Sequence, residues 1–223
     1  MPKKLLKIKP IIVYGHEGPV VAQVVIVIKE LNLPYELQPL TADAPALRRS
    51  RRSLIYDPNG DLYLWEPHAI VSYLVTTYDD YLKISFMRDK DWFYMSDEWH
   101  SFQVDLMATT RVFRQLLEPG TREVAAFTNE VVGGLETIQE ALIENMDEVI
   151  YMDDGKTRVT NGPWLVNNKM SYADLAICCW IYYVNRTSPQ PIHLPYPFVS
   201  QWFEKVLSRG EVRSTFASLM PRR

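Results

Sequence analysis

Bulky apolar side chains recur at spacings of three and four residues in one stretch of the sequence: Trp92, Met95, Trp99 and Phe102. On a helix, residues three and four apart lie on the same face, so these side chains would form one stripe. A stripe of this density would suit a flat, hydrophobic ligand. An ordinary buried core presents the same pattern and is the more common reason for it, so both interpretations stay open. Polar residues flank the stripe: Ser96, His100 and Gln103.

The two cysteines of the chain, Cys178 and Cys179, are adjacent. Neighbouring side chains on a helix point about 100° apart, so this pair cannot form an ordinary disulfide. A reduced, cytoplasmic setting is therefore expected, and no metal site is predicted.

Length and composition favour a folded, globular protein. The chain has 223 residues, of which 47% are hydrophobic, enough for one large or two modest cores. Its formal net charge of -3 gives no excess of Lys and Arg for binding nucleic acid. Lys7, Lys9 and Pro10 interrupt the apolar run of a secretory signal, and no stretch reaches the roughly 20 apolar residues that span a bilayer. We therefore expect neither a nucleic-acid partner nor a membrane.

The first part of the sequence alternates short apolar runs with turn residues. Residues 11–14 predict a buried strand. Pro19 suits a first helical turn, and residues 20–31 continue as a helix, although the Val and Ile content of residues 24–28 would equally suit a strand. Residues 33–37 are a second strand candidate, so the chain begins as a βαβ unit.

A hairpin is predicted next. Turn residues at 57–60 separate two strand candidates, residues 54–56 and 61–65. A proline then opens a helix predicted over residues 67–78. The basic segment 41–53 has no clean period, and we expect a loop with one irregular helical turn there.

Beyond residue 80 the strand signals stop and helical periods take over. The predicted helices span residues 92–117, 121–149, 171–184 and 197–208. The polar segment 151–162 is expected to be a loop. A βαβ and ββα unit followed by a helical bundle is an α+β arrangement in two domains, which we place at residues 1–82 and 89–223.

Stretches 18–36, 57–66 and 164–176 resemble the glutathione S-transferase family, and within it the fungal branch that includes the yeast nitrogen-regulator type. The resemblance covers nearly the whole chain. It implies a thioredoxin-like N-terminal domain that binds glutathione, an all-helical C-terminal domain that helps to bind a hydrophobic substrate, and a homodimer. Ser171 and Asp174, which stand three apart, also predict a structural capping box at the start of a helix, with Asp in place of Glu.

Catalysis in that family requires the glutathione thiol to be held as a thiolate, because a free thiol of this kind has a pKa of about 8.5. The position where the fungal branch usually carries an Asn donor is Val20 here, and its side chain cannot donate. The backbone N–H groups of Val20 or Val21 remain, or a side chain just upstream, with His16 first and Tyr14 second as catalytic candidates. A cationic imidazole at His16 would lower the thiol pKa; the alternative is a solvated loop histidine.

The resemblance implies that Glu66 pairs with the α-amino group of the γ-glutamyl arm; the alternative is a carboxylate that only caps the following helix. The next residue in the family is a Ser that binds the γ-glutamyl carboxylate, but this chain has Pro67, which offers neither a hydroxyl nor an N–H. His68 would supply a backbone N–H at the same helix N-terminus, or its ring.

A third difference from the family lies at Ser53, where the family has a cis-proline that shapes the loop. Leu54 would still form main-chain bonds with the cysteinyl part of glutathione if the loop keeps its path, and we expect a trans bond with altered loop geometry. Arg51 and Arg52 would bind the glycyl carboxylate as charged forks; the alternative is a solvated basic loop.

Three functions remain open. The first is a transferase that joins glutathione to a hydrophobic electrophile. The second is a glutathione-dependent cis-trans isomerase or lyase, whose thiolate adds reversibly to a conjugated double bond. The third is a non-catalytic binding or regulatory protein. Fungal relatives often act in the biosynthesis of secondary metabolites, so the resemblance favours a pathway-specific enzyme for a polyketide-like or otherwise conjugated substrate. That preference rests on analogy, because fold alone does not fix function.

Overall fold

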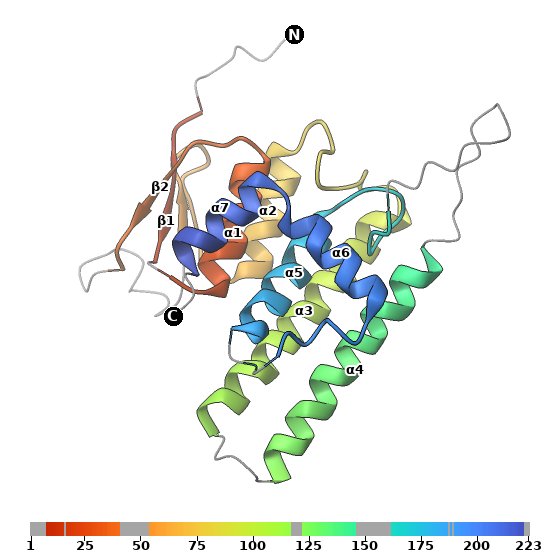
Figure 1. Cartoon of the computed structure of the whole chain (residues 1–223). Helices are drawn as coiled ribbons and strands as arrows, with labels where there is room; N and C mark the ends of the chain where they lie inside the picture. The colour runs from red at the N-terminus through yellow and green to blue at the C-terminus, as the bar shows by residue number, and fades with distance from the viewer. Residues whose placement is uncertain are drawn as a thin grey trace, which may run out of the picture. The chain divides into compact units, whose positions relative to one another are not determined.

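The computed structural model describes residues 8–15, 17–40, 54–116, 122–145, 162–186, 188 and 190–220. Four candidate site residues lie outside these ranges: His16, Arg51, Arg52 and Ser53. Backbone contacts divide the chain into two compact units, Met1–Lys83 with Arg213–Arg223 and Ile84–Val212. Figure 1 shows the elements of each unit.

The first unit is built on a four-stranded sheet with the strand order β2-β1-β3-β4. The strands are β1 (Ile11–Tyr14), β2 (Tyr35–Gln38), β3 (Leu54–Asp57) and β4 (Leu62–Leu64). β1 pairs in parallel with β2 and antiparallel with β3, and β3 pairs antiparallel with β4. A parallel pair needs a crossover connection, which α1 (Pro19–Glu30) supplies. The predicted βαβ start and the predicted hairpin are both observed.

α1 is a helix throughout, which resolves the ambiguity of residues 24–28. Every residue from Val21 to Ile28 is buried. The helix is therefore surrounded on all sides, and burial of its Val and Ile side chains outweighs their lower helix propensity. α1 packs against α2 (Pro67–Tyr78), the helix that follows the hairpin, and each begins with a proline, as predicted.

A buried carboxylate fixes the hairpin to α2. Asp57, at the end of β3, is fully buried and accepts hydrogen bonds from Asn59 N and Nδ2, both at 2.8 Å, from Tyr73 Oη at 2.6 Å and from Tyr78 Oη. Asn59 also donates to the Lys9 carbonyl at 3.0 Å. Burial alone would raise the pKa of Asp57, but the hydrogen bonds from the tyrosines and Asn59 outweigh it and lower the pKa.

We expect Asp57→Asn to lower the free energy of unfolding by about 1–3 kcal/mol at neutral pH, because the hydroxyls of two half-buried tyrosines lose a charged acceptor. The folded carboxyl has a lower pKa than the unfolded one. Its stabilising effect is therefore complete above the unfolded value of about 3.9 and is lost as the pH falls through the lower, folded value. Urea unfolding of both proteins across acid pH measures this: the difference between them should shrink below about pH 4. A difference that stays constant would contradict this role.

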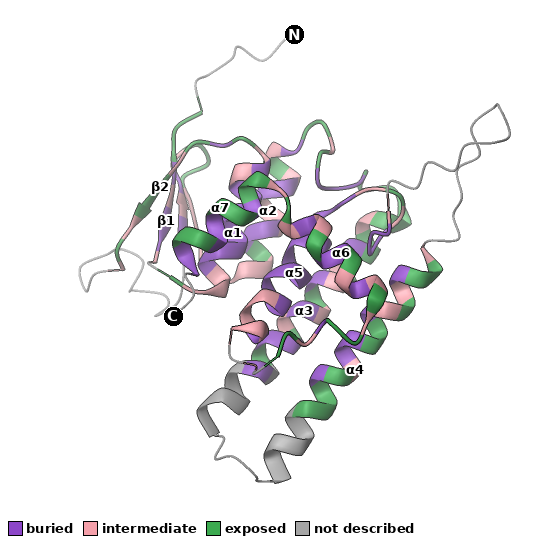
Figure 2. Ribbon diagram, in the orientation of Figure 1, coloured by how far each residue is buried: buried purple, intermediate pink, exposed green. Residues whose placement is uncertain are grey.

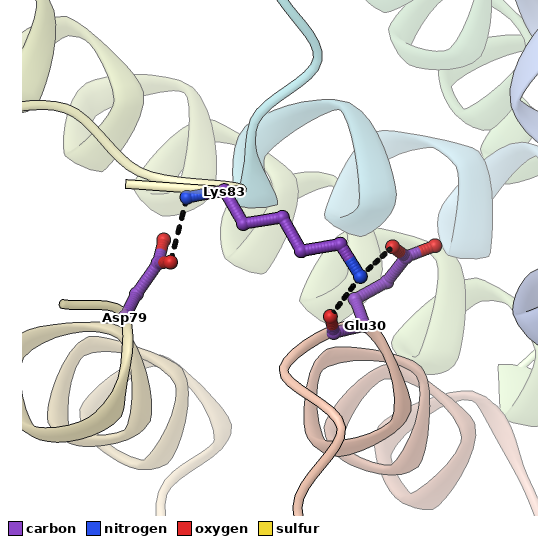
Figure 3. Close-up of polar contacts among 3 residues, drawn as sticks. All are labelled: Glu30, Asp79 and Lys83. Atoms are coloured by element: carbon purple, nitrogen blue, oxygen red, sulfur yellow. Dashed lines mark hydrogen bonds and ion pairs between the residues drawn. The ribbon is translucent and has the colours of Figure 1, made fainter. Parts of the chain in front are cut away.

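Figure 3 shows a second polar cluster of the first unit, formed by Glu30, Asp79 and Lys83. Glu30 ends α1 and is fully buried; Lys83 Nζ lies 3.5 Å from Glu30 Oε2 and also donates to the Glu30 carbonyl. The backbone N–H of Lys83 donates to Asp79 Oδ1 at 2.6 Å, just after the end of α2. The cluster therefore ties the C-terminal end of α1 to the segment that follows α2.

α7 (Gly210–Leu219) lies outside the helix ranges predicted from the sequence. Its buried apolar side chains do recur at helical spacing: Val212, Phe216 and Leu219. The helical pattern predicts one domain over residues 89–223, whereas the backbone contacts group residues 213–223 with the first unit. There, Leu219 O accepts a hydrogen bond from Gly18 N at 3.1 Å.

The second unit contains the long helices α3 (Asp91–Leu116), α4 (Arg122–Glu144), α5 (Tyr172–Asn185) and α6 (Pro197–Leu207). α3 and α6 each pack against both α4 and α5. Figure 2 shows α5 buried along most of its length, with exposed residues along α4. Gly134 allows a close approach of α4, because a β-carbon there would lie 2.9 Å from Leu106 Cδ2. Among the helices that the structure describes, none is long and apolar enough to span a membrane.

α4 is shorter in the structure than the predicted range of 121–149. The helix ends at Glu144, and Asn145 forms a turn whose Nδ2 donates to Trp164 O at 3.0 Å and Leu165 O at 2.8 Å. Residues 146–149 lie outside the described ranges.

Side chains cap the N-termini of α5 and α6. Ser171 Oγ accepts from a first-turn N–H of α5 at 3.3 Å, and Asp174 Oδ2 accepts from Ser171 N at 2.8 Å, so the predicted capping box is present. α6 is capped from another helix, because Gln139 Oε1 of α4 accepts from Phe198 N and Val199 N, both at 3.2 Å. At the N-termini of α5 and α6, these side chains accept hydrogen bonds from backbone N–H groups that have no acceptor within their own helix.

Candidate functional site

The N-cap residue of α1 is Gly18, which has no side chain to cap the helix. Its φ of 115° and ψ of 168° suit glycine and strain other residues. Pro19 has no N–H, and the first helical bond runs from Ala22 N to Gly18 O at 3.0 Å. The N–H groups of Val20 and Val21 therefore have no acceptor within the helix, and the positive end of the helix dipole favours an anion there. The arrangement suits a bound thiolate.

Tyr14 ends β1, and its ring belongs to an aromatic cluster on one face of the sheet. It packs with Ile12, Leu40, Tyr56 and Tyr63, and the rings of Tyr56 and Tyr63 stack with centroids 4.2 Å apart. Tyr14 is 7% exposed. Burial, and then the neighbouring Tyr63, raise the pKa of Tyr14, which keeps its hydroxyl protonated. The structure thus gives this ring a packing role, and its catalytic role stays a prediction.

Leu54 is the first residue of β3 and lies directly opposite Tyr14 in the antiparallel ladder. Its main chain is therefore at the end of β1 from which the chain continues to α1. Of the residues predicted to act near it, Arg51, Arg52 and Ser53 lie outside the described ranges, as does His16.

Glu66 is the N-cap residue of α2, but its side chain does not cap the helix. Its backbone is extended, with φ −96° and ψ 127°, and its carbonyl accepts the first helical bond from Ile70 N at 2.9 Å. The side chain is half-buried. Within the described part of the chain, the structure gives the carboxylate neither a hydrogen bond nor an ion pair. The capping alternative is therefore not realised, and the carboxylate is available to a cationic ligand.

The two residues after Glu66 open α2. Pro67 is the first helical residue. Because it has no N–H and no hydroxyl, it cannot donate a hydrogen bond at the position where the family has a Ser. His68 is the second helical residue and is half-buried, which puts its backbone N–H in the first turn of the helix. The start of α2 thus offers one carboxylate and main-chain donors.

The apolar stripe on α3 is partly exposed. Trp92 and Met95 are 44% and 40% exposed, and Trp99 and Phe102 are half-buried. The rings of Trp99 and Phe102 meet edge to face with centroids 5.5 Å apart. Trp92 and Met95 are thus not core residues, and an apolar surface remains on this helix.

The buried face of α3 is instead largely polar. Ser96, His100, Gln103 and Thr110 are buried. The two hydroxyl groups return to carbonyls of the same helix, Ser96 Oγ to Trp92 O at 2.8 Å and Thr110 Oγ1 to Leu106 O at 2.7 Å. Thr110 Oγ1 also accepts from Trp180 Nε1 of α5 at 3.0 Å. Bonds of this kind let polar residues occupy the interior, and the sequence pattern gave no sign of them.

Comparison with known proteins extends these observations. A family model described as the C-terminal domain of glutathione S-transferase matches residues 109–210. The glutathione S-transferase-like protein gedE of Aspergillus terreus is 32% identical over an alignment of 231 positions, and the alignment covers 96% of this chain and 98% of that protein. The glutathione S-transferase-like protein tpcF of Aspergillus fumigatus is 31% identical over 228 residues, with the same coverage of 96% and 98%. The predicted resemblance to fungal members is confirmed.

Solved structures show the fold. A glutathione transferase homolog from Lodderomyces elongisporus with two glutathione molecules per subunit has a TM-score of 0.77 at 22% identity, over 93% of this chain and 98% of that one. Yeast Ure2p in complex with glutathione has a TM-score of 0.76 at 23% identity, over 94% and 95% of the two chains. The predicted α+β fold, a thioredoxin-like N-terminal part followed by an all-helical part, is confirmed. Through its similarity to gedE over almost its full length, the chain belongs to the glutathione S-transferase family.

Proposed function

We propose that the chain is a glutathione-dependent enzyme in which the thiolate of bound glutathione attacks a hydrophobic, conjugated electrophile. The observation that carries the proposal is the carboxylate of Glu66, which stands at the start of α2 without capping it. A carboxylate so placed is suited to bind the cationic α-amino group of the γ-glutamyl arm. Solved structures of similar fold that contain glutathione support this choice of ligand.

Thiolate formation is assigned to the start of α1. A free thiol with a pKa of about 8.5 is mostly protonated at neutral pH. The N–H groups of Val20 and Val21 would donate to the sulfur anion, and the helix terminus would stabilise it by about 0.3–2 kcal/mol. Main-chain donors would thus replace the Asn side chain usual in the fungal branch, and a cationic His16 would lower the thiol pKa further.

Other residues at the sequence-predicted site are assigned to the rest of the tripeptide. His68 would donate its backbone N–H to the γ-glutamyl carboxylate, because Pro67 offers no donor there. Leu54 would pair its main chain with the cysteinyl part. Arg51 and Arg52 would bind the glycyl carboxylate.

The electrophile is assigned to the apolar stripe of α3. Covering exposed apolar surface contributes about 25 cal/mol per Å², so a flat ligand gains by lying on Trp92 and Met95. The similarity to fungal proteins such as gedE and tpcF supports a secondary-metabolite pathway, and therefore a polyketide-like or otherwise conjugated substrate.

We also propose a homodimer, as the family implies; light scattering that shows only monomer at high concentration would reject it.

Product analysis tests the reaction. The purified protein is incubated with glutathione and a set of conjugated enones, and the products are separated and weighed by mass spectrometry. Transfer gives a product heavier by the mass of glutathione and consumes the thiol. Isomerisation gives a product of unchanged mass and returns the thiol. That result would mean that the thiolate adds reversibly to the substrate and is not transferred to it. No rate above the uncatalysed background with any enone would reject the enzymatic proposal.

We expect the double substitution Trp92→Ala with Met95→Ala to raise the KM for the electrophile about 5- to 50-fold, because apolar contact area is lost. Each side chain is more than half covered within the protein, and the Trp92 ring lies 6.0 Å from the Phe86 ring between centroids. The free energy of unfolding should therefore fall by about 1–3 kcal/mol, and KM is compared at a temperature where melting curves show the variant folded. The dissociation constant of glutathione should stay unchanged. Tyr94→Ala is the matched control, since Tyr94 is a 65% exposed aromatic on the same helix outside the stripe. Equal KM values for the double variant and wild type would contradict the assignment.

A further inference from the structure

We infer that α7 positions the catalytic N-terminus of α1 through one main-chain hydrogen bond, in which Leu219 O accepts from Gly18 N at 3.1 Å. The catalytic meaning of this bond rests on the proposed function, in which the first turn of α1 stabilises the glutathione thiolate. The geometry of the bond can be tested without any reaction.

Gly18 is the residue whose direction the bond fixes. Its N–H is held by Leu219, and its carbonyl accepts the first helical bond of α1 from Ala22 N at 3.0 Å. Gly18 has no side chain to cap the helix, and its φ of 115° lies in a region that only glycine adopts easily. Because glycine moves among many backbone conformations at little cost, the peptide before α1 needs an external partner to keep one orientation. Leu219 is that partner.

α7 is well placed to be a rigid partner. Phe216, Leu219 and Met220 are 1%, 5% and 0% exposed. A second bond lies toward the other end of α1, where Lys29 Nζ donates to Ser214 Oγ at 3.2 Å. Ser214 therefore lies near the end of α1 and Leu219 near its beginning, so the two helices run antiparallel within the first unit, and Figure 1 shows α7 beside α1.

The bond also uses groups that the two helices cannot satisfy alone. The last carbonyls of a helix have no donor within it, and Leu219 is the last residue of α7. The N–H of an N-cap residue likewise has no helical acceptor. Joining them fixes the start of α1 and leaves the N–H groups of Val20 and Val21 to an anion. Without the bond, the backbone dihedral angles of Gly18 can change, and the N–H groups of Val20 and Val21 no longer point in one fixed direction.

Two shortened chains separate the carbonyl from the side chains. The first ends at Ser218 and so lacks the Leu219 carbonyl. The second ends at Met220 and carries Leu219→Ala and Met220→Ala, so it loses the same side chains but keeps the carbonyl. Melting curves of both set a temperature at which each is folded. Hydrogen exchange of the Gly18 amide is then measured by NMR, and the thiolate of bound glutathione is titrated by its ultraviolet absorbance.

We expect the Gly18 amide to be protected in wild type and in the chain ending at Met220, and to exchange at least about tenfold faster in the chain ending at Ser218. In that chain alone, the thiolate fraction at neutral pH should fall about three- to tenfold. Equal changes in both shortened chains, or no change in either, overturn the inference. If wild type protects Gly18 but binds glutathione without forming a thiolate, the assignment of the thiolate to α1 fails while the hydrogen bond stands.

Discussion

Glu66→Ala is expected to weaken glutathione binding about 10- to 100-fold, the range that loss of a charge-assisted hydrogen bond to an ammonium group gives. The side chain makes no cap to α2 and is half-buried. Its removal should therefore cost the fold only the interaction of the charge with the helix dipole, about 0.3–1 kcal/mol. Titration calorimetry measures the affinity, and thermal melting measures the fold.

Two further substitutions make this test specific. Glu66→Gln keeps the size of the side chain and an acceptor but removes the charge, so its affinity should lie between those of wild type and Glu66→Ala. Glu36→Ala removes an exposed carboxylate from β2 of the same unit and should leave the affinity unchanged. Equal affinities for wild type and Glu66→Ala would show that this carboxylate does not bind the γ-glutamyl amine.

Asp174→Ala should have the largest effect on stability, a loss of about 3–5 kcal/mol in the free energy of unfolding. The carboxylate is fully buried. Oδ1 accepts from Leu165 N at 3.0 Å and Trp202 Nε1 at 2.8 Å, and Oδ2 accepts from Ser171 N at 2.8 Å and Ser171 Oγ at 3.2 Å. It thus joins the start of α5, the preceding segment and α6. Alanine would leave these donors buried without their acceptor, which costs more than the bonds themselves contribute.

Denaturant unfolding measures this loss, with two comparisons. Asp174→Asn retains one carbonyl oxygen for Leu165 and Trp202 but turns an amide group toward the N–H of Ser171, so it should also destabilise, by about 2–4 kcal/mol. Asp89→Ala removes an exposed carboxylate that lies 3.9 Å from Lys90 and should change the unfolding free energy by less than about 0.5 kcal/mol. A loss below about 1 kcal/mol for Asp174→Ala would contradict the role of this carboxylate.

The order of elements was predictable because the sequence marks their ends. Pro19 and Pro67 each open a helix, the turn residues at 57–60 separate two strands, and Ser171 with Asp174 starts α5. These are local signals, set by backbone geometry and hydrogen bonds between residues close in the chain. The structure has them where the sequence put them, within one or two residues.

Contacts between distant residues were not predictable from local patterns. The turn signal at Asp57 did not reveal that its carboxylate binds Tyr73 and Tyr78, which lie 16 and 21 residues further on. The period of α3 identified a helix but not its buried face, because hydroxyl groups such as Thr110 can be satisfied by the helix itself. α7 escaped prediction because its apolar pattern, from Val212 to Leu219, spans only about two turns and its partners are in the N-terminal part of the chain.

The candidate site was predicted by resemblance more than by physics. Nothing in the local sequence distinguishes a Glu66 that caps α2 from one that does not, since Glu at an N-cap is compatible with both. The structure separates the two, because it records no cap from this side chain. Val20 in place of Asn shows the loss of a side-chain donor. The structure adds that α1 still starts with main-chain donors and that its N-cap residue has no side chain.

Titration calorimetry of glutathione with the full wild-type chain tests the central claim most directly, because every catalytic step proposed above begins with bound glutathione. We predict a dissociation constant between micromolar and low millimolar, with release of a proton as the bound thiol ionises. Absence of heat at millimolar glutathione would contradict the account: the changes at Val20, Ser53 and Pro67 would then have removed glutathione binding, and a non-catalytic role would stand in its place.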